Sequence, residues 1–110
     1  MPMSYSRFEP AAVLGLDGQI YIFGGFGSNI SINRNNATLA NIEVHNIKSN
    51  SWTVKTAQMS MPRFALASVL ASAGQVYAIG GYNSNNVPRQ VIEAYNPAVN
   101  VWGKTPLTGG

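Results

Sequence analysis

Apolar residues gather in short runs along the chain, and each run ends at residues that favour turns. The first run covers 11–16 and is followed by Asp17-Gly18, after which a second run covers 20–23. Short apolar runs bounded by glycine, asparagine or aspartate are typical of β-strands. Asp17-Gly18 predicts a two-residue hairpin turn, because both residues tolerate the backbone angles that such a turn needs. The pattern therefore predicts an all-β chain.

The same pattern occurs twice. Positions in the first half return 56 residues later up to the second glycine of a Gly-Gly pair, and 50 residues later beyond it. The matched positions are Arg7 and Arg63, Phe8 and Phe64, Tyr21 and Tyr77, Gly24-Gly25 and Gly80-Gly81, Glu43 and Glu93, and Trp52 and Trp102. Insertions in repeat proteins fall in loops, so the longer first copy predicts a long loop over 26–41.

Each copy predicts four strands. They cover 11–16, 20–23, 42–47 and 51–55 in the first copy, and 67–72, 76–79, 91–95 and 101–104 in the second. Residues 66–73 are rich in alanine and leucine and favour a helix by propensity. Their counterpart contains Gly15, so the repeat favours a strand instead. A four-stranded unit that recurs every 50 to 56 residues is typical of a β-propeller blade, and we divide the chain into units 1–56 and 57–110.

The two copies resemble kelch repeats. That family's pattern runs from an arginine through an apolar strand to a Gly-Gly pair, then to a glutamate, a ring residue and a tryptophan. Here the ring residues are His45 and Tyr95, and Met61-Pro62-Arg63 matches the family closely. The resemblance implies two four-stranded antiparallel blades in which the glycine pairs, Tyr21, Tyr77, both glutamates and both tryptophans serve the framework.

Two blades are too few to close a propeller, which has about four to eight. Each free blade would expose an apolar face that is suited to a neighbour. Only 10% of the residues are charged, which fits a chain that hides much of its surface. We therefore expect either further blades in a longer chain or a homo-oligomeric ring, with three chains giving six blades.

Composition narrows the chemistry. The chain has no cysteine and one histidine, and it contains no phosphate-binding loop or hydrolase motif. We expect no catalytic residues, no metal site and no cofactor, and hence no enzyme. The net charge is +3, but the basic residues do not cluster in sequence, so we expect no nucleic-acid partner.

The chain carries no sign of membrane insertion or export. Its longest apolar stretch, 65–73, is far shorter than the roughly 20 residues that span a bilayer. The N-terminal residues do not read as a secretory signal. We expect a soluble protein, with the cytoplasm favoured and the compartment otherwise undetermined.

Two interpretations apply to the arginines. Arg7 and Arg63 recur at matched positions, which favours a framework role. The kelch resemblance instead implies that the arginine of the Met-Pro-Arg segment and polar loop residues line a basic pocket for acidic peptides, since arginine pairs bidentately with carboxylates. The candidate ligand-binding residues are Arg63, Arg89, Arg7, Arg34, Asn85 and Asn36.

Three function classes follow. The first is a module that binds a protein or peptide partner through its blade loops. The second is carbohydrate binding, in which loop residues such as Phe26 and Tyr82 would hold sugars. The third, implied by the kelch resemblance, is a fragment of a sugar-processing enzyme, although copper oxidases of that kind need a cysteine that this chain lacks.

Overall fold

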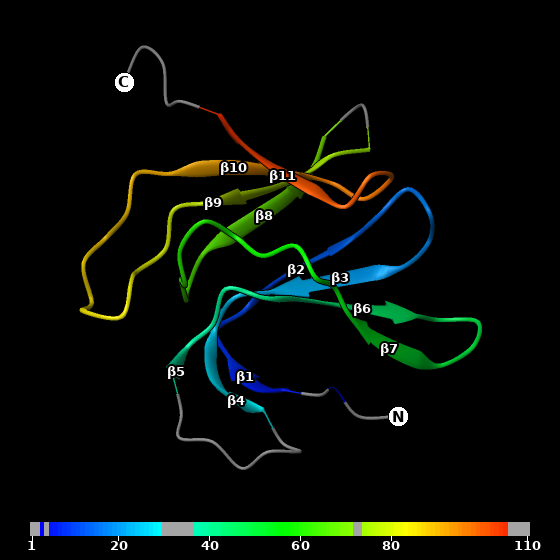
Figure 1. Cartoon of the computed structure of the whole chain (residues 1–110), viewed down its shortest axis with the longest axis horizontal. Coiled ribbons are helices and arrows are strands. Elements are labelled where there is room, and N and C mark those ends of the chain that lie inside the picture. The colour runs from blue at the N-terminus through cyan, green and yellow to red at the C-terminus, as the bar shows by residue number, and fades with distance from the viewer. Residues whose placement is uncertain (1–2, 4, 30–36, 72–73, 106–110) are drawn as a thin grey trace.

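The computed structural model describes residues 3, 5–29, 37–71 and 74–105, and its regular elements are all strands. Two four-stranded antiparallel sheets have the same neighbour order, β2-β3-β6-β7 and β8-β9-β10-β11, and form two propeller blades, blade 1 and blade 2 (Figure 1). The strands are β2 (Ala11–Leu14), β3 (Ile20–Phe23), β6 (Ile42–Asn46), β7 (Ser51–Val54), β8 (Ala67–Leu70), β9 (Val76–Ile79), β10 (Ile92–Asn96) and β11 (Val101–Thr105). The predicted fold class is confirmed, including a strand where propensity favoured a helix.

The first hairpin turn is longer than predicted. The backbone N–H of Gly15 donates to the carbonyl of Gln19 at 2.9 Å, which leaves three residues between them. Gly18 has a φ of 79°, as expected for the left-handed residue that ends a three-residue hairpin loop. The strand that was predicted to reach residue 16 therefore ends at Leu14, and blade 2 repeats the arrangement.

The predicted loop over 26–41 is wrong in part, because it contains two strands. A third sheet has the order β1-β4-β5, with strands β1 (Tyr5–Phe8), β4 (Phe26–Asn29) and β5 (Ala37–Thr38). Blade 2 has two isolated bridges at the matched place, from Tyr82 to Phe64 and from Tyr82 to Pro88, in its described residues. The extra residues of the first copy lengthen these bridges into ladders, while residues 30–36 lie outside the description.

The core lies between the two blades. Tyr21 and Phe23 of β3 are buried in one apolar cluster with Val76 and Tyr95 of blade 2. The rings of Tyr21 and Tyr95 lie 6.1 Å apart, a spacing at which aromatic pairs attract. Burial of each such side chain contributes about 1.5–3 kcal/mol, so this junction is the main stabilising contact between the units.

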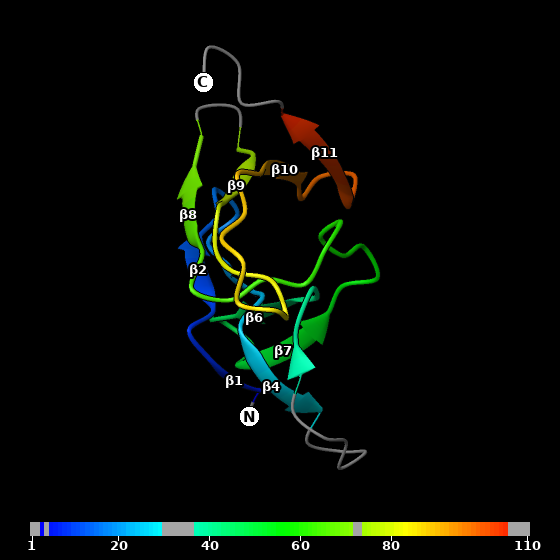
Figure 2. The same ribbon diagram turned by 90° about the vertical axis from the view of Figure 1, so that its left-hand side faces the viewer.

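The innermost strands of the two blades run side by side. β2 and β8 are neighbours in both views (Figures 1 and 2). The hydroxyl of Ser68 donates to the carbonyl of Ala12 at 2.9 Å, and these two positions are 56 residues apart, one full repeat. The blades are therefore related by the same step as the sequence copies. The described part of the chain includes no helix that could cross a membrane.

Candidate functional site

A buried ion pair anchors blade 2. The Nη2 of Arg63 lies 2.7 Å from Oε2 of Glu93, and its Nη1 donates to the carbonyl of Gly80 at 2.8 Å. The other carboxylate oxygen of Glu93 accepts from the backbone N–H of Ser60 at 2.9 Å. Burial lowers the pKa of Arg63, and the charge of Glu93 opposes that shift. The pair ties the segment before the blade to its third strand.

Blade 1 repeats this anchor. Arg7 donates to the carbonyl of Gly24 at 2.8 Å and to Glu43 at 2.9 Å, and Glu43 accepts from the backbone of Tyr5. The side chains of Arg7 and Arg63 are both 0% exposed. This geometry favours the framework interpretation of both arginines, because neither presents its guanidinium to a ligand in the chain as described.

The other predicted ligand-binding residues lie apart from this anchor or outside the description. Arg89 is half-buried in the loop after β9, and its Nε has no hydrogen-bond partner within the described residues. Asn85 is exposed in the same loop, where its N–H donates to Asn83. Arg34 and Asn36 lie outside the described residues. The ligand-binding role of all these residues stays a prediction.

The glycine pairs let the blades approach closely. Gly24 and Gly25 have φ values of 71° and 95°, which favour glycine strongly. A Cβ at Gly24 would lie 2.6 Å from the carbonyl oxygen of Arg63. The N–H of Gly25 donates to that same oxygen at 2.8 Å. Both glycines are therefore required at the junction between the blades.

His45, the single histidine, has a framework role that matches Tyr95. Its ring lies 4.6 Å from Trp52, while the ring of Tyr95 lies 5.1 Å from Trp102. The Nε2 of His45 is 3.1 Å from the Oδ1 of Asn50, which parallels the bond from the Tyr95 hydroxyl to Asn100. No group of three or more potential metal-ligating side chains occurs in the described ranges.

An aromatic pocket opens at the end of the blades that carries the glycine pairs, which we call the glycine end. It has a volume of about 350 Å³. Its lining residues are Phe8, Glu9, Phe26, Thr38, Phe64, Ser84 and Asn86. They come from the segments before the two innermost strands and from the loops that follow β3 and β9. Both blades therefore build this aromatic pocket.

Two repeat-equivalent aromatic pairs meet at this pocket, in which Phe8, Phe26 and Phe64 line the cavity and Tyr82 contacts Phe64 without lining it. The rings of Phe8 and Phe26 lie 5.5 Å apart, and those of Phe64 and Tyr82 lie 5.7 Å apart. Phe8 is 56% exposed, so an apolar ring of the lining faces solvent here. Glu9 supplies the only charged side chain among the lining residues that the structure describes.

Part of this site could be predicted from the sequence. Of the two rings that we expected to hold sugars, Phe26 lines the pocket and Tyr82 does not, while Phe8 and Phe64 were given no function. The repeated Arg-Phe dipeptide was the available signal, because it places a ring beside each framework arginine. The sequence could not show that the rings of Phe8, Phe26 and Phe64 meet around one cavity.

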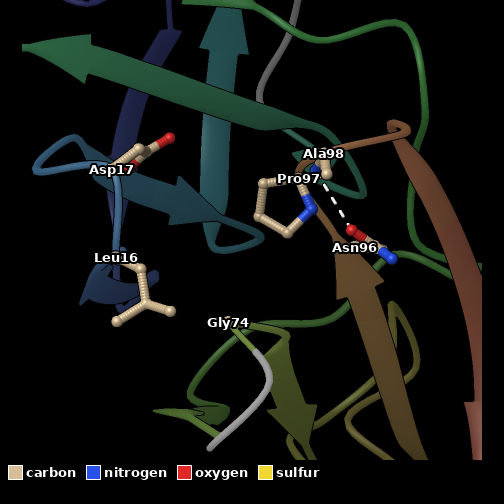
Figure 3. A pocket seen from close by; sticks show the side chains of 6 residues that line it. All are labelled: Leu16, Asp17, Gly74, Asn96, Pro97 and Ala98. Atoms are coloured by element: carbon tan, nitrogen blue, oxygen red, sulfur yellow. Dashed lines mark hydrogen bonds between the residues drawn. The ribbon is translucent and has the colours of Figure 1, made fainter.

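A second pocket of about 260 Å³ lies at the opposite end, between the hairpin turns of the two blades (Figure 3). Asp17 is the only charged residue in the described part of its lining, and it accepts hydrogen bonds from the Tyr21 hydroxyl at 2.6 Å and from Gln19. Partial burial opposes ionisation, but these hydrogen bonds outweigh it and hold the pKa of Asp17 below its ordinary value. The carboxylate of Asp17 therefore binds groups of its own hairpin. The aromatic pocket is the better candidate site.

Comparison with known families gives a match to the Kelch motif over residues 7–56 and 63–104. Human Kelch-like protein 28 is 30% identical over 89 residues, which cover 77% of this chain and 14% of that protein. Human Kelch-like protein 33 is 32% identical over 100 residues, which cover 91% of this chain and 17% of that protein. The N-acetylneuraminate epimerase of Pasteurella multocida (strain Pm70) is 32% identical over 77 residues, with 70% and 20% covered.

Solved structures agree on the architecture. The structure of YjhT superposes with a TM-score of 0.80 at 17% identity, covering 94% of this chain and 38% of that one. A fungal alcohol oxidase of the AA5 family in complex with copper superposes at 0.66 and 29% identity, covering 94% and 19%. The chain spans a fifth or less of the curated relatives that it matches.

These comparisons correct one expectation. The absence of enzymatic motifs led us to expect that the chain is not an enzyme. A relative of 32% identity is an epimerase, so the same repeats occur in an enzyme that acts on a sugar. Local motifs missed this because a propeller assembles its sites from loops of several blades, and two blades hold only part of them.

Proposed function

The chain belongs to the kelch-repeat family, and on that premise we propose that it binds a partner protein in the aromatic pocket at the glycine end of its blades. The exposed ring of Phe8, which lines this pocket together with the rings of Phe26 and Phe64, carries this proposal. Aromatic rings that converge on a cavity are the usual anchors of protein interfaces, because they bury a large apolar area at little cost in conformational entropy.

The shape of the pocket limits what it accepts. A volume of about 350 Å³ is close to the lower limit of ligand pockets, so it suits one or two side chains of a partner rather than an extended surface. Thr38, Ser84 and Asn86 add neutral hydrogen-bonding groups at its edge. A peptide segment with one large apolar side chain fits these features.

Charge refines the partner. Glu9 is exposed and is the only ionisable residue among the described residues that line the pocket, whereas the framework holds both Arg7 and Arg63 out of reach. A carboxylate at the rim attracts cations and repels anions. We therefore favour a partner segment in which lysine or arginine flanks the apolar side chain, in place of the acidic peptide that the kelch resemblance implied.

Fluorescence polarisation with short labelled peptides tests the proposal. The peptides carry one phenylalanine flanked by lysine, by serine or by glutamate. We expect the lysine-flanked peptide to bind best, and Phe8→Ala to weaken it about tenfold, which is about 1.4 kcal/mol. Glu9→Gln should remove the preference for lysine over serine.

Leu16→Ala is the matched control, because Leu16 is also an exposed apolar residue but lies at the opposite end of the blades. Its affinity should equal that of the wild type. Equal losses in Phe8→Ala and Leu16→Ala, or tightest binding of the glutamate-flanked peptide, would refute the proposed site.

A second candidate is sugar binding as part of a sugar-processing propeller. The relationship to an N-acetylneuraminate epimerase favours it, and rings with neutral polar groups also suit sugars. Glu9 disfavours an anionic sugar in this pocket. Calorimetric titration with N-acetylneuraminate and with neutral N-acetylglucosamine distinguishes the candidates, since saturable heat with either sugar, abolished by Phe8→Ala, would favour this one.

A further inference from the structure

Within the described residues, the two blades leave two unlike faces with exposed apolar side chains. Side chains alternate between the faces of a strand, so β3 directs Tyr21 and Phe23 toward blade 2, and β9 directs the matched Tyr77 and Ile79 away from blade 1. We call this outward face of blade 2 the leading face. It comprises Ala67, Val69, Tyr77, Ile79, Ile92 and Ala94.

The opposite face of blade 1 is the trailing face. It comprises Leu14, Ile20, Ile22, His45 and Trp52, which match Leu70, Val76, Ala78, Tyr95 and Trp102 of blade 2. In blade 2 those five residues pack into the junction with blade 1. Each free face is therefore a second copy of one half of a junction that the chain already contains.

If each free face matches one half of the junction, its side chains should be more exposed than their counterparts inside the junction, and they are. Phe23 is 0% exposed inside the junction, whereas Ile79 is 36% exposed on the leading face. Val13 and Leu70 pack against the core, while their counterparts Val69 and Leu14 are 51% and 57% exposed. Both free faces therefore expose apolar side chains. Exposed apolar area of this kind lowers solubility and favours association.

Backbone groups repeat the pattern. Across the existing junction, Gly25 N–H donates to the Arg63 carbonyl and Ala65 N–H donates to the Glu9 carbonyl, both at 2.8 Å. The matched groups of a further junction are the Gly81 N–H and the Ala65 carbonyl. Neither has a backbone partner within the described part of the chain. The leading face therefore offers hydrogen bonds as well as apolar area.

We propose that copies of this chain associate head to tail, with the leading face of one copy packed on the trailing face of the next. The junction inside the chain is the template, since both halves of it recur on the free faces. Such a contact is heterologous, so it grows until a ring closes. Three copies would give six blades, within the range of closed propellers.

Light scattering after size exclusion tests the association. The wild-type chain should elute with a mass of at least twice 11.8 kDa. Val69→Asp should block the leading face and Leu14→Asp the trailing face, and each variant alone should run as a single chain of 11.8 kDa. Both residues are more than half exposed, so the fold should persist, which circular dichroism checks.

Mixing the two variants gives the sharpest readout. One intact leading face and one intact trailing face remain, so the mixture should form a dimer of twice 11.8 kDa that grows no further. Val99→Asp, at an exposed turn outside both faces, should keep the wild-type mass.

A folded wild type of 11.8 kDa at every concentration would overturn the proposal. A Leu14→Asp variant that still dimerises by itself would also overturn it, because its leading faces would then be pairing with each other. Neither outcome bears on the aromatic pocket, so the peptide-binding proposal stands or falls separately.

Discussion

Arg63 and Glu93 lie 30 residues apart in the chain, and their side chains meet at 2.7 Å with almost no exposure to solvent. Arg7 and Glu43 form the same contact in the other blade. In each blade the pair holds the segment before the innermost strand against the third strand. Arg7 and Arg63, for which the sequence allowed both a framework and a ligand-binding role, thus help to build the blades.

Removal of one partner should therefore be costly. Arg63→Met leaves the carboxylate of Glu93 buried without its cation, which typically costs about 3–5 kcal/mol. Urea denaturation should show that loss, while Arg89→Met should cost less than about 1 kcal/mol, because Arg89 is half-buried and makes no ion pair in the described residues. The double variant Arg63→Met, Glu93→Leu should recover part of the loss. Equal stabilities of the two single variants would contradict this account of the anchor.

Glycine substitutions should separate backbone strain from steric conflict. Gly18 and Gly24 both have positive φ, but a Cβ at Gly18 meets nothing within 4 Å, whereas one at Gly24 lies 2.6 Å from the Arg63 carbonyl. Gly18→Ala should cost about 1–2 kcal/mol from strain alone. Gly24→Ala should cost clearly more in the same thermal or urea measurement. A smaller loss for Gly24→Ala would show that the blades have room to separate.

The ring at position 45 should be exchangeable. His45→Tyr reproduces the arrangement of Tyr95, with a ring against tryptophan and a hydroxyl directed at asparagine. We expect its stability to stay within about 1 kcal/mol of the wild type, and His45→Ala to lose about 0.5–1.5 kcal/mol with the ring pair. Greater damage from tyrosine than from alanine would show that the histidine has a role beyond the framework.

Asp17 should make stability depend on pH. Its pKa is held below the ordinary value of 3.8 in the fold, so the ionised carboxylate stabilises the native chain at neutral pH. That contribution is lost as the pH falls through the lowered pKa. Wild type should therefore be more stable than Asp17→Asn at pH 7, and the difference should shrink toward pH about 3. A stability difference between wild type and Asp17→Asn that stays constant from pH 7 to 3 would contradict this role of the Asp17 carboxylate.

Much of the fold could be predicted because the second copy repeats the sequence pattern of the first. The match between 11–16 and 67–72 overrode the helix propensity of the alanine-rich run, and a shared strand is what the structure contains. The strands of the first copy between 26 and 41 escaped prediction because their counterparts in the described part of the second copy are two isolated bridges at Tyr82.

The site was harder to predict for a physical reason. A guanidinium has the same chemistry whether it faces solvent or a buried carboxylate, so the sequence could not assign Arg63 to one role. The aromatic pocket depends on Phe8 and Phe64 facing one cavity from different blades, which only the junction geometry determines.

We propose that ligands bind at the glycine end, in the pocket lined by Phe8, Phe26 and Phe64. Backbone amide chemical shifts, recorded while the lysine-flanked phenylalanine peptide is titrated into the labelled chain, distinguish this site from the opposite pocket. The largest changes should fall at Phe8, Phe26 and Phe64. Changes that are centred instead on Leu16 and 96–98, at the opposite pocket, would contradict this proposal.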